Sequence, residues 1–328
     1  MLRIPARAIA WGLVLTMGLV AAAQAEPGYP NKPIKIIVPW PPGAATDAAA
    51  RVIGEKLSQT VGQPVVVDNR PGANGTIGTS VAAKAPADGY TLLVATADTH
   101  SINPFIYRTL PYDAVRNFEP ITLFATASFV WISRPDLPGS TLSEVIAQAK
   151  TKPGKVTFGT WGVGSAAHVA GALLESGSGA ELMHVPFPGA GPAMTALIGG
   201  HVDLMPHVAI IADQQRRAGK VKILGVAGPK RALPMLPDVP TLAEMGIKDA
   251  EAGSWYGLMA PAGLPADVRK KLSDALNDVL TKPEMAQRLT DLGLTPLTLR
   301  EGDFQAFLQR ENQRFGDIIT RKSIRAEQ

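Results

Sequence analysis

The sequence predicts an α/β protein of two domains, each with a mostly parallel sheet flanked by helices. Continuous apolar runs rich in β-branched residues alternate with amphipathic helical stretches, as expected for strands covered on both faces. The 328 residues are enough for about two domains. In addition, a strand, a Gly-rich bend and a helix start occur together twice, at 34–47 and at 155–168. This alternation favours βαβ units over an all-α or all-β fold.

The expected elements follow from these two kinds of run. Strands are expected at Ile34–Val38, Val65–Asp68, Thr91–Ala95, Phe129–Ser133, Val156–Gly159, His184–Val185, Asp203–Met205 and Ile223–Ala227. Helices are expected at 48–61, 166–175 and 192–198. Pro192 suits the first position of the third helix, and Gly199 suits its end. Beyond residue 265, helical stripes at 268–279 and 304–319 without a further strand predict a tail that folds back onto the first domain.

The first residues have the pattern of a secretory signal. Arg3 and Arg7 form a positive region, an apolar stretch covers 8–20, and 23–25 reads Ala-Gln-Ala, as at a cleavage site. The apolar stretch is shorter than the roughly 20 residues of a membrane span. We therefore expect a cleavable signal peptide at residues 1–25 and an exported mature protein.

No linker, repeat or low-complexity tract marks a domain boundary, so the strand crossovers must set it. The chain is expected to cross from the first domain to the second near 121–133 and to return near 250–257. This divides the mature chain into a discontinuous lobe I, residues 26–125 plus 255–328, and a continuous lobe II, residues 126–254.

Composition excludes several classes of function. With 0 cysteines the chain has no disulfide, thiol nucleophile or thiolate zinc site. The 32 basic and 28 acidic residues give a formal net charge of +4, and no Lys/Arg block marks a surface for nucleic acid or membrane. The 5 histidines form no metal-binding pattern, and no phosphate or dinucleotide motif stands in its required context. We therefore expect no metal, no cofactor and no nucleic-acid or membrane-surface partner.

The first bend, residues 39–47, suits an anion. A helix that starts after a strand directs several backbone N–H groups and the positive end of its dipole at open space. Gly43 allows close backbone approach, and Thr46 or Asp47 can cap the helix. The Asp47 carboxylate would repel an anion, so we expect it to accept N–H bonds within the turn and leave neighbouring donors free. A purely structural turn is the alternative.

The second bend, residues 162–168, places Ser165 ahead of a helix start. Ser165 can cap that helix or bind a ligand oxygen. An exported serine hydrolase, with Ser165 as nucleophile and His168 as its base, is the alternative. The motif G-x-S-x-G is absent, and residues three apart on a helix seldom align for proton transfer, which favours capping or ligand binding. Two such bends facing each other would hold an acidic small molecule from both sides.

Two further loops follow strands. The Gly/Pro-rich stretch 185–192 offers more N–H donors, with Phe187 as an apolar wall, and 96–101 supplies hydroxyls at a strand's carboxyl end, where open α/β sheets place ligands. His207, two residues past an expected strand, is the histidine that can face a cleft. Ordinary connecting turns are the alternative for both loops.

Seven motifs together carry a family resemblance. They are Tyr29-Pro30 with Pro33-Ile34, Val38-Pro39-Trp40-Pro41-Pro42-Gly43 through Asp47, Asp68-Asn69-Arg70-Pro71-Gly72-Ala73, Ala87-Asp88-Gly89-Tyr90-Thr91-Leu92, Gly164-Ser165 with His168, His184-Val185-Pro186, and Leu236-Pro237-Asp238-Val239-Pro240-Thr241-Leu242-Ala243-Glu244. The chain thereby resembles the extracytoplasmic receptors of tripartite tricarboxylate transporters, the Bug family. The similarity covers essentially the whole mature chain, and the order of the motifs is highly specific.

The resemblance implies a two-lobed periplasmic binding protein, type II-like and of the Venus-flytrap kind. Such a protein closes on a small organic acid, a mono- or dicarboxylate, and delivers it to membrane transporter subunits; a monomer is its natural default. The implied ligand-binding residues are Trp40, Gly43, Ala45, Thr46 and Asp47 in the first lobe, Gly164, Ser165 and Ala166 in the second, and Thr96, Thr99, Phe187, Ala190 and His207 nearer the variable end of the ligand.

Two departures from the family pattern concern this site. Ala44 stands where many members have a second glycine, and Met205-Pro206-His207 replaces a short acidic or amide sequence. A sensory partner that presents the bound acid to a membrane kinase is an alternative role that the sequence leaves open.

Overall fold

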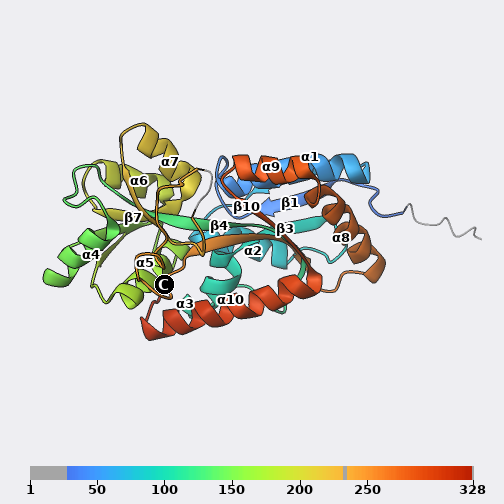
Figure 1. Cartoon of the computed structure of the whole chain (residues 1–328). Helices are drawn as coiled ribbons and strands as arrows, with labels where there is room; N and C mark the ends of the chain where they lie inside the picture. The colour runs from blue at the N-terminus through green and yellow to red at the C-terminus, as the bar shows by residue number, and fades with distance from the viewer. Residues whose placement is uncertain (1–27, 232–234, 327–328) are drawn as a thin grey trace, which may run out of the picture.

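The computed structural model describes residues 28–231 and 235–326 (Figure 1). In these ranges a ten-stranded sheet follows the order β2-β1-β3-β9-β4-β7-β5-β6, and β8 and β10 also pair with β4. The strands are β1 (Ile34–Val38), β2 (Val65–Asn69), β3 (Thr91–Thr96), β4 (Phe118–Ser133), β5 (Thr157–Thr160), β6 (Met183–Pro186), β7 (Leu204–Val208), β8 (Lys222–Val226), β9 (Gly253–Pro261) and β10 (Thr295–Arg300). The expected signal peptide, residues 1–25, lies outside the described residues.

The helices alternate with these strands. They are α1 (Ala45–Val61), α2 (Thr76–Ala83), α3 (Asn103–Ile106), α4 (Leu142–Thr151), α5 (Ala166–Ser178), α6 (Ala190–Ile198), α7 (Ala209–Arg217), α8 (Ala266–Leu280), α9 (Pro283–Asp291) and α10 (Glu301–Arg321), with short helical turns η1 (Ala73–Gly75) and η2 (Asp98–Ile102). In Figure 1, α4 to α7 lie at one end of the molecule and α1, α8 and α9 at the other.

The long strand β4 joins the two ends of the molecule. Its residues 118–128 pair with β9, whereas 129–133 pair with β7 and β8. We call the part built on β1, β2, β3, β9 and β10 lobe I, and the part built on β5 to β8 lobe II. The returning chain meets β4 at the same place, because Phe129 N donates to Ala252 O at 3.0 Å. The two passages between the lobes therefore lie side by side.

The α/β fold class is confirmed, with a sheet more mixed than the sequence predicts. β1 is parallel to β2 and β3, and β5 is parallel to β6 and β7, but every pair that involves β4 or β9 is antiparallel. The connecting passages are themselves strands, and these add antiparallel pairs to the centre of the sheet. The expectation of a tail without strands is wrong, since β10 pairs antiparallel with β4.

The sheet of lobe I is covered on both faces. Ile34, Ile36 and Val38 of β1 are buried against Ile53 and Leu57 of α1, and α8 packs on the same side. Burying each such side chain contributes roughly 1.5–3 kcal/mol. The opposite face packs on α10, which also contacts η2, α3 and α5. The carboxyl ends of β1 and β3 are thereby held in a fixed relation to the start of α1.

Two helices begin earlier than the sequence suggests. α1 starts at Ala45, where 48 was expected, and α6 starts at Ala190 after an N-cap at Gly189. Pro192 is therefore not the first residue of α6 but lies inside its first turn, where a backbone N–H has no intrahelical acceptor in any case.

Candidate ligand-binding site

The first bend leads from β1 into α1, and Asp47 holds its shape. Gly43 has a left-handed backbone (φ +84°) and donates its N–H to Asp47 Oδ2 at 2.9 Å. The Asp47 carboxylate is 4% exposed and therefore belongs to the turn rather than to the surface. The prediction that Asp47 accepts an N–H bond within the turn is confirmed.

A side chain of α1 and one from the end of β2 complete this turn. Arg51 Nε donates to Asp47 Oδ2 at 3.1 Å, and Asn69, at the end of β2, donates to Asp47 Oδ1 at 3.0 Å and to Trp40 O at 3.1 Å. Burial raises the pKa of Asp47, but the hydrogen bonds from Arg51, Gly43 and Asn69 outweigh it, so the net pKa lies below its usual value. Asp47 is ionised at neutral pH, and Arg51 offsets its charge.

The first turn of α1 keeps open donors. Its N-cap residue, Ala44, has no side chain that can bond back to the helix. Within the described ranges, the N–H groups of Ala45, Thr46 and Asp47 meet no side-chain or loop acceptor. Because these groups also carry the positive end of the helix dipole, this turn is suited to a carboxylate.

Thr96 and Tyr256 lie on the part of the lobe I sheet that faces α1. Thr96 ends β3 and pairs with Tyr256 of β9. Leu92 and Val94, two and four residues earlier on β3, pack in the same apolar cluster as α1, so strand alternation puts Thr96 on that face. Thr96 is 1% exposed, and its hydroxyl has no hydrogen-bond partner in the described part of the chain. Thr99, in contrast, is fully buried and uses its hydroxyl on the main chain of Thr96.

The second bend leads from β5 into α5, and Ser165 caps the helix. Ser165 Oγ accepts the His168 N–H at 3.3 Å and donates to Gly162 O at 2.8 Å. The His168 ring is engaged elsewhere, because its Nδ1 accepts the Gly164 N–H at 3.0 Å. Ser165 and His168 therefore do not form a nucleophile–base pair, and the serine hydrolase alternative is wrong.

A carboxylate from lobe I reaches the start of α5. Asp98, the residue that opens η2, accepts the Ala166 N–H at 2.9 Å. Burial raises the pKa of Asp98 to about 6, although hydrogen bonds from Ala166, its own backbone, Trp161 and Asn74 act in the opposite direction. Sequence reasoning missed this contact. The available signal was an acid two residues after β3, at the carboxyl end of a strand, where α/β sheets place their sites.

Two stacked histidines lie behind the second bend. The rings of His168 and His184 are 3.7 Å apart at 15°, and His184 Nε2 lies 2.6 Å from Thr160 Oγ1. Burial lowers the pKa of His168 to about 4 and that of His184 to about 3, where the neighbouring ring adds to the effect. Both rings are therefore neutral at pH 7. For His168 this agrees with the hydrogen bond from Gly164, because a ring nitrogen that accepts an N–H bond carries no proton.

The remaining predicted residues lie on lobe II beside Trp161. Phe187 N donates to Thr160 O at 2.9 Å, which fixes the loop before α6, and Ala190 opens that helix. His207, on β7, has its ring centre 6.1 Å from that of Trp161, and its buried Nδ1 has no partner among the described residues. Burial lowers the pKa of His207 to about 4.

The two bends are linked through the end of β3. A Cβ on Gly75 would lie 3.6 Å from the Trp40 ring and 2.6 Å from Thr99 Cγ2, so both side chains pack close to Gly75. Thr99 adjoins Asp98, which bonds to the start of α5. A Cβ on Gly164 would in turn lie 2.2 Å from Ile106 of lobe I. The structure thus brings most of the predicted residues near one lobe junction, with Phe187, Ala190 and His207 on its lobe II side.

Comparison with known proteins decides the family. Residues 49–324 match the model of the TctC family, described as the tripartite tricarboxylate transporter family receptor. The chain belongs to this family. A UPF0065 protein from the tcbD-tcbE intergenic region of a Pseudomonas species is 35% identical over 324 residues, which cover 98% of this chain and 96% of that protein. BugT of Bordetella pertussis is 33% identical over 309 residues, 93% of this chain and 94% of BugT.

Solved structures agree with the two-lobed binding-protein fold of this receptor. The periplasmic binding protein BugD has a TM-score of 0.80 at 34% identity, over 91% of this chain and 100% of BugD. A protein of R. palustris solved with adipate has a TM-score of 0.84 at 30% identity, over 90% and 99% of the two chains. MatC of Rhodopseudomonas palustris, solved with bound malate, has a TM-score of 0.78 at 32% identity, over 89% and 100%. These relatives are solute-binding proteins, and the receptor is not an enzyme.

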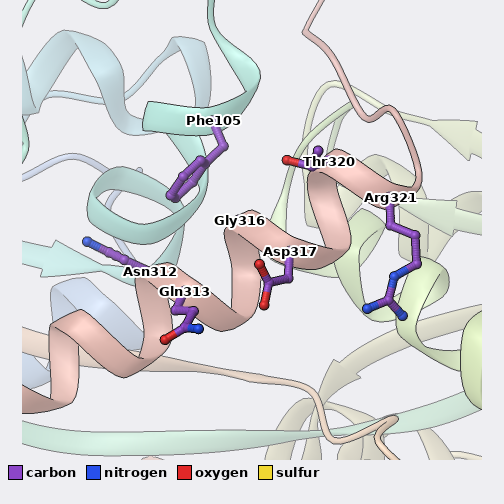
Figure 2. Close-up of a pocket in the computed structure, with 7 residues that line it drawn as sticks. All are labelled: Phe105, Asn312, Gln313, Gly316, Asp317, Thr320 and Arg321. Atoms are coloured by element: carbon purple, nitrogen blue, oxygen red, sulfur yellow. The ribbon is translucent and has the colours of Figure 1, made fainter.

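The described residues contain no group of three or more His, Cys, Asp or Glu placed to hold a metal ion. No helix in the same ranges is both long and apolar enough to cross a membrane. A separate hollow of about 550 Å³ lies between α3 and α10 and is shown in Figure 2; its lining residues are Phe105, Asn312, Gln313, Gly316, Asp317, Thr320 and Arg321. None of them belongs to either bend.

Proposed function

We propose that this receptor captures a small carboxylate-bearing molecule between its two lobes and delivers it to the membrane components of a tripartite tricarboxylate-type transporter. The observation that carries the proposal is the open first turn of α1, with Asp47 withdrawn into the turn and its charge offset by Arg51. The carboxylates bound by two relatives, adipate and malate, support the same class of ligand.

The predicted residues take distinct roles in this proposal. The N–H groups of Ala45 and Thr46 bind the ligand carboxylate, while Trp40 and Gly43 shape the turn. The unpartnered hydroxyl of Thr96 provides a further hydrogen bond. Charge-assisted hydrogen bonds contribute on the order of 1.5–3 kcal/mol each, so a few of them, with burial of the rest of the ligand, reach the roughly 8 kcal/mol of micromolar binding.

The other residues contact the rest of the ligand from lobe II. Gly164, Ser165 and Ala166 form the opposing wall, and Phe187, Ala190 and His207 face the distal part. Neutral His207 supplies either a donor or an acceptor, because its Nδ1 is buried without a partner among the described residues.

We further propose that the lobes close by bending where the chain passes between them. The lobe boundaries then fall near residues 126 and 254, with lobe I formed by 26–125 and 255–328. The two passages lie side by side, which is the arrangement that permits hinge closure around a ligand. A cleavable signal peptide at residues 1–25 would export this monomeric receptor to the periplasm.

Ligand capture is tested by calorimetric titration of the purified receptor, freed of any co-purified ligand, with a panel of mono- and dicarboxylates. We expect at least one acid to bind with a Kd in the micromolar range or below. Binding of a sugar or a metal cation with no acid binding would contradict the proposal.

Delivery is tested in cells by uptake of the labelled acid. Deleting the receptor, or the membrane components of the transporter, should abolish uptake to the same extent. If uptake persists in both deletions while gene induction by the acid is lost, the receptor serves a sensor instead.

A further inference from the structure

Most N–H donors at the start of α5 are already in use, and in its first turn only that of Ala167 meets no acceptor among the described residues. The Gly164 N–H donates to His168 Nδ1, and the Ser165 N–H donates to Gly162 O at 3.2 Å. The Ala166 N–H donates to Asp98, and the His168 N–H donates to Ser165 Oγ. A ligand carboxylate at this end would have to displace Asp98 from Ala166. The larger set of open donors is therefore that of α1, with three N–H groups against one at α5.

A second observation marks the α1 side as the place for that group. The Thr96 hydroxyl is 1% exposed, lies on the α1 face of the sheet, and has no hydrogen-bond partner in the ranges that the structure describes. A buried hydroxyl without a partner costs free energy, and a ligand oxygen next to the first turn of α1 would supply that partner. The open N–H groups of α1 and the unpartnered Thr96 hydroxyl are independent observations, and both favour binding the anionic end of a ligand on the α1 side.

Asp98 lies at the same end of β3 as Thr96, two residues further along the chain. Burial raises the pKa of Tyr256, and the charge of Asp98 raises it further. Tyr256 is the cross-strand partner of Thr96. Asp98 is therefore joined to the α1 side of the site through the end of β3, while its carboxylate accepts the Ala166 N–H of lobe II.

Asp98 lacks a cationic partner in the described part of the chain. The groups that hydrogen-bond to it are the N–H of Ala166, its own backbone and the side chains of Trp161 and Asn74, all of which are neutral. A carboxylate buried without a positive charge is costly, and a second carboxylate brought beside it would raise that cost. A positive charge or a hydrogen-bond donor would lower it.

We propose that Asp98 determines the class of ligand: the receptor prefers a molecule with one carboxylate, bound at α1, and an ammonium or other hydrogen-bond donor that binds Asp98, over a dicarboxylate of equal length. This inference rests on the proposed function. It separates the receptor from the relatives solved with adipate and malate, both of which are dicarboxylates.

The test is a calorimetric titration with pairs of matched length: 5-aminopentanoate against adipate, 4-aminobutyrate against glutarate, and 3-aminopropanoate against succinate. We expect the amino acid of the best-binding pair to bind at least tenfold more tightly than its dicarboxylate. Tighter binding of the dicarboxylate would overturn the inference and leave the proposed function intact. Absence of binding by every carboxylate would overturn both.

The substitution Asp98→Asn tests the role of the residue itself. It keeps an oxygen that can accept the Ala166 N–H but removes the charge, so amino-acid binding should fall at least tenfold and dicarboxylate binding should rise. Asp317→Asn, an exposed carboxylate of α10 remote from both bends, is the matched control and should leave the ratio unchanged. An unchanged ratio in Asp98→Asn would overturn the inference, and if that variant does not fold, the ranking measured on the natural receptor decides alone.

Discussion

The two bends share the pattern of a strand, a glycine-containing turn and a helix start, but they have opposite hydrogen-bonding states. At the first, the N-cap is Ala44 and the helix N–H groups remain open; at the second, Ser165 caps the helix and Asp98 bonds to Ala166. In both, an aspartate lies at a helix start, yet Asp47 is turned into its own bend whereas Asp98 comes from the other lobe. The comparison teaches that a helix N-terminus becomes an anion site only when no side chain of the protein reaches it first.

The largest effect is expected from a matched pair of glycine substitutions. Gly43 and Gly164 both have positive φ, +84° and +71°, so alanine strains the backbone at each by roughly 1 kcal/mol. Only at Gly164 would the new Cβ collide, 2.2 Å from the buried Ile106, whereas nothing lies within 4 Å at Gly43. We expect Gly164→Ala to lower the free energy of unfolding by about 3 kcal/mol and Gly43→Ala by about 1 kcal/mol.

Urea unfolding of both variants measures this difference. Equal losses would mean that the two lobes do not approach as closely at the second bend as the structure shows.

Removing Asp47 should cost somewhat less. Asp47→Ala leaves the Gly43 N–H and the Asn69 amide without their acceptor and should lower the unfolding free energy by about 2 kcal/mol. Arg51→Ala should cost under about 1 kcal/mol, because the Arg51 side chain is 54% exposed. Since the folded pKa of Asp47 is depressed, its contribution is present above pH 3.8 and lost as the pH falls further.

Denaturant titrations of these two variants at pH 7 provide the comparison. A smaller loss in Asp47→Ala than in Arg51→Ala would show that the carboxylate does not organise the first bend.

Exchanging the N-cap residues sharpens the contrast between the bends. Ser165→Ala removes the cap of α5 and should lower the unfolding free energy by about 1 kcal/mol. Ala44→Ser introduces a cap at α1 and should stabilise the protein by about 0.5 kcal/mol. The new hydroxyl would take up an N–H group proposed to bind ligand, so acid binding should weaken several-fold. A capped α1 that binds acid as tightly as before would argue against the α1 turn as the anion site.

The smallest effect is expected in the slope of stability with pH, to which His168 and Asp98 contribute with opposite signs. The folded pKa of His168 is about 4, below its usual 6.5, so the unfolded chain binds the extra proton and stability falls as the pH drops from 6.5 to 4. The pKa of Asp98 is raised from 3.8 to about 6, which gives the opposite slope, because the folded state there binds the proton. We expect His168→Gln to flatten the acid loss and Asp98→Asn to steepen it.

Unfolding free energies measured between pH 4 and 7 distinguish the two slopes. The same change of slope in both variants would contradict the assignment of opposite signs.

Sequence patterns predicted the strands and helices that are determined by a few neighbouring residues. β1 has the expected bounds, and α8 and α10 lie where the apolar stripes predicted helices. The turn role of Asp47 also followed from local chemistry, because Gly43, its hydrogen-bond partner, is only four residues away. The ligand contacts of the thirteen candidate residues stay a prediction.

The missed elements depend on distant partners. β9 and β10 are strands because β4 lies beside them, and the short alternation in β10, at 297–300, is too brief to predict a strand by itself. Asp98 reads as an ordinary turn residue until its partner, Ala166, is known, 68 positions further along the chain.

By itself, the sequence determined that this chain would form βα units with two glycine-rich helix starts, since backbone preferences and helix capping act over a few neighbouring residues. Only the tertiary structure decided which start stays open to a ligand. That outcome depends on side chains from distant parts of the chain: Asn69 of β2 helps to hold the carboxylate of the first bend in place, whereas Asp98 of lobe I accepts the Ala166 N–H at the second.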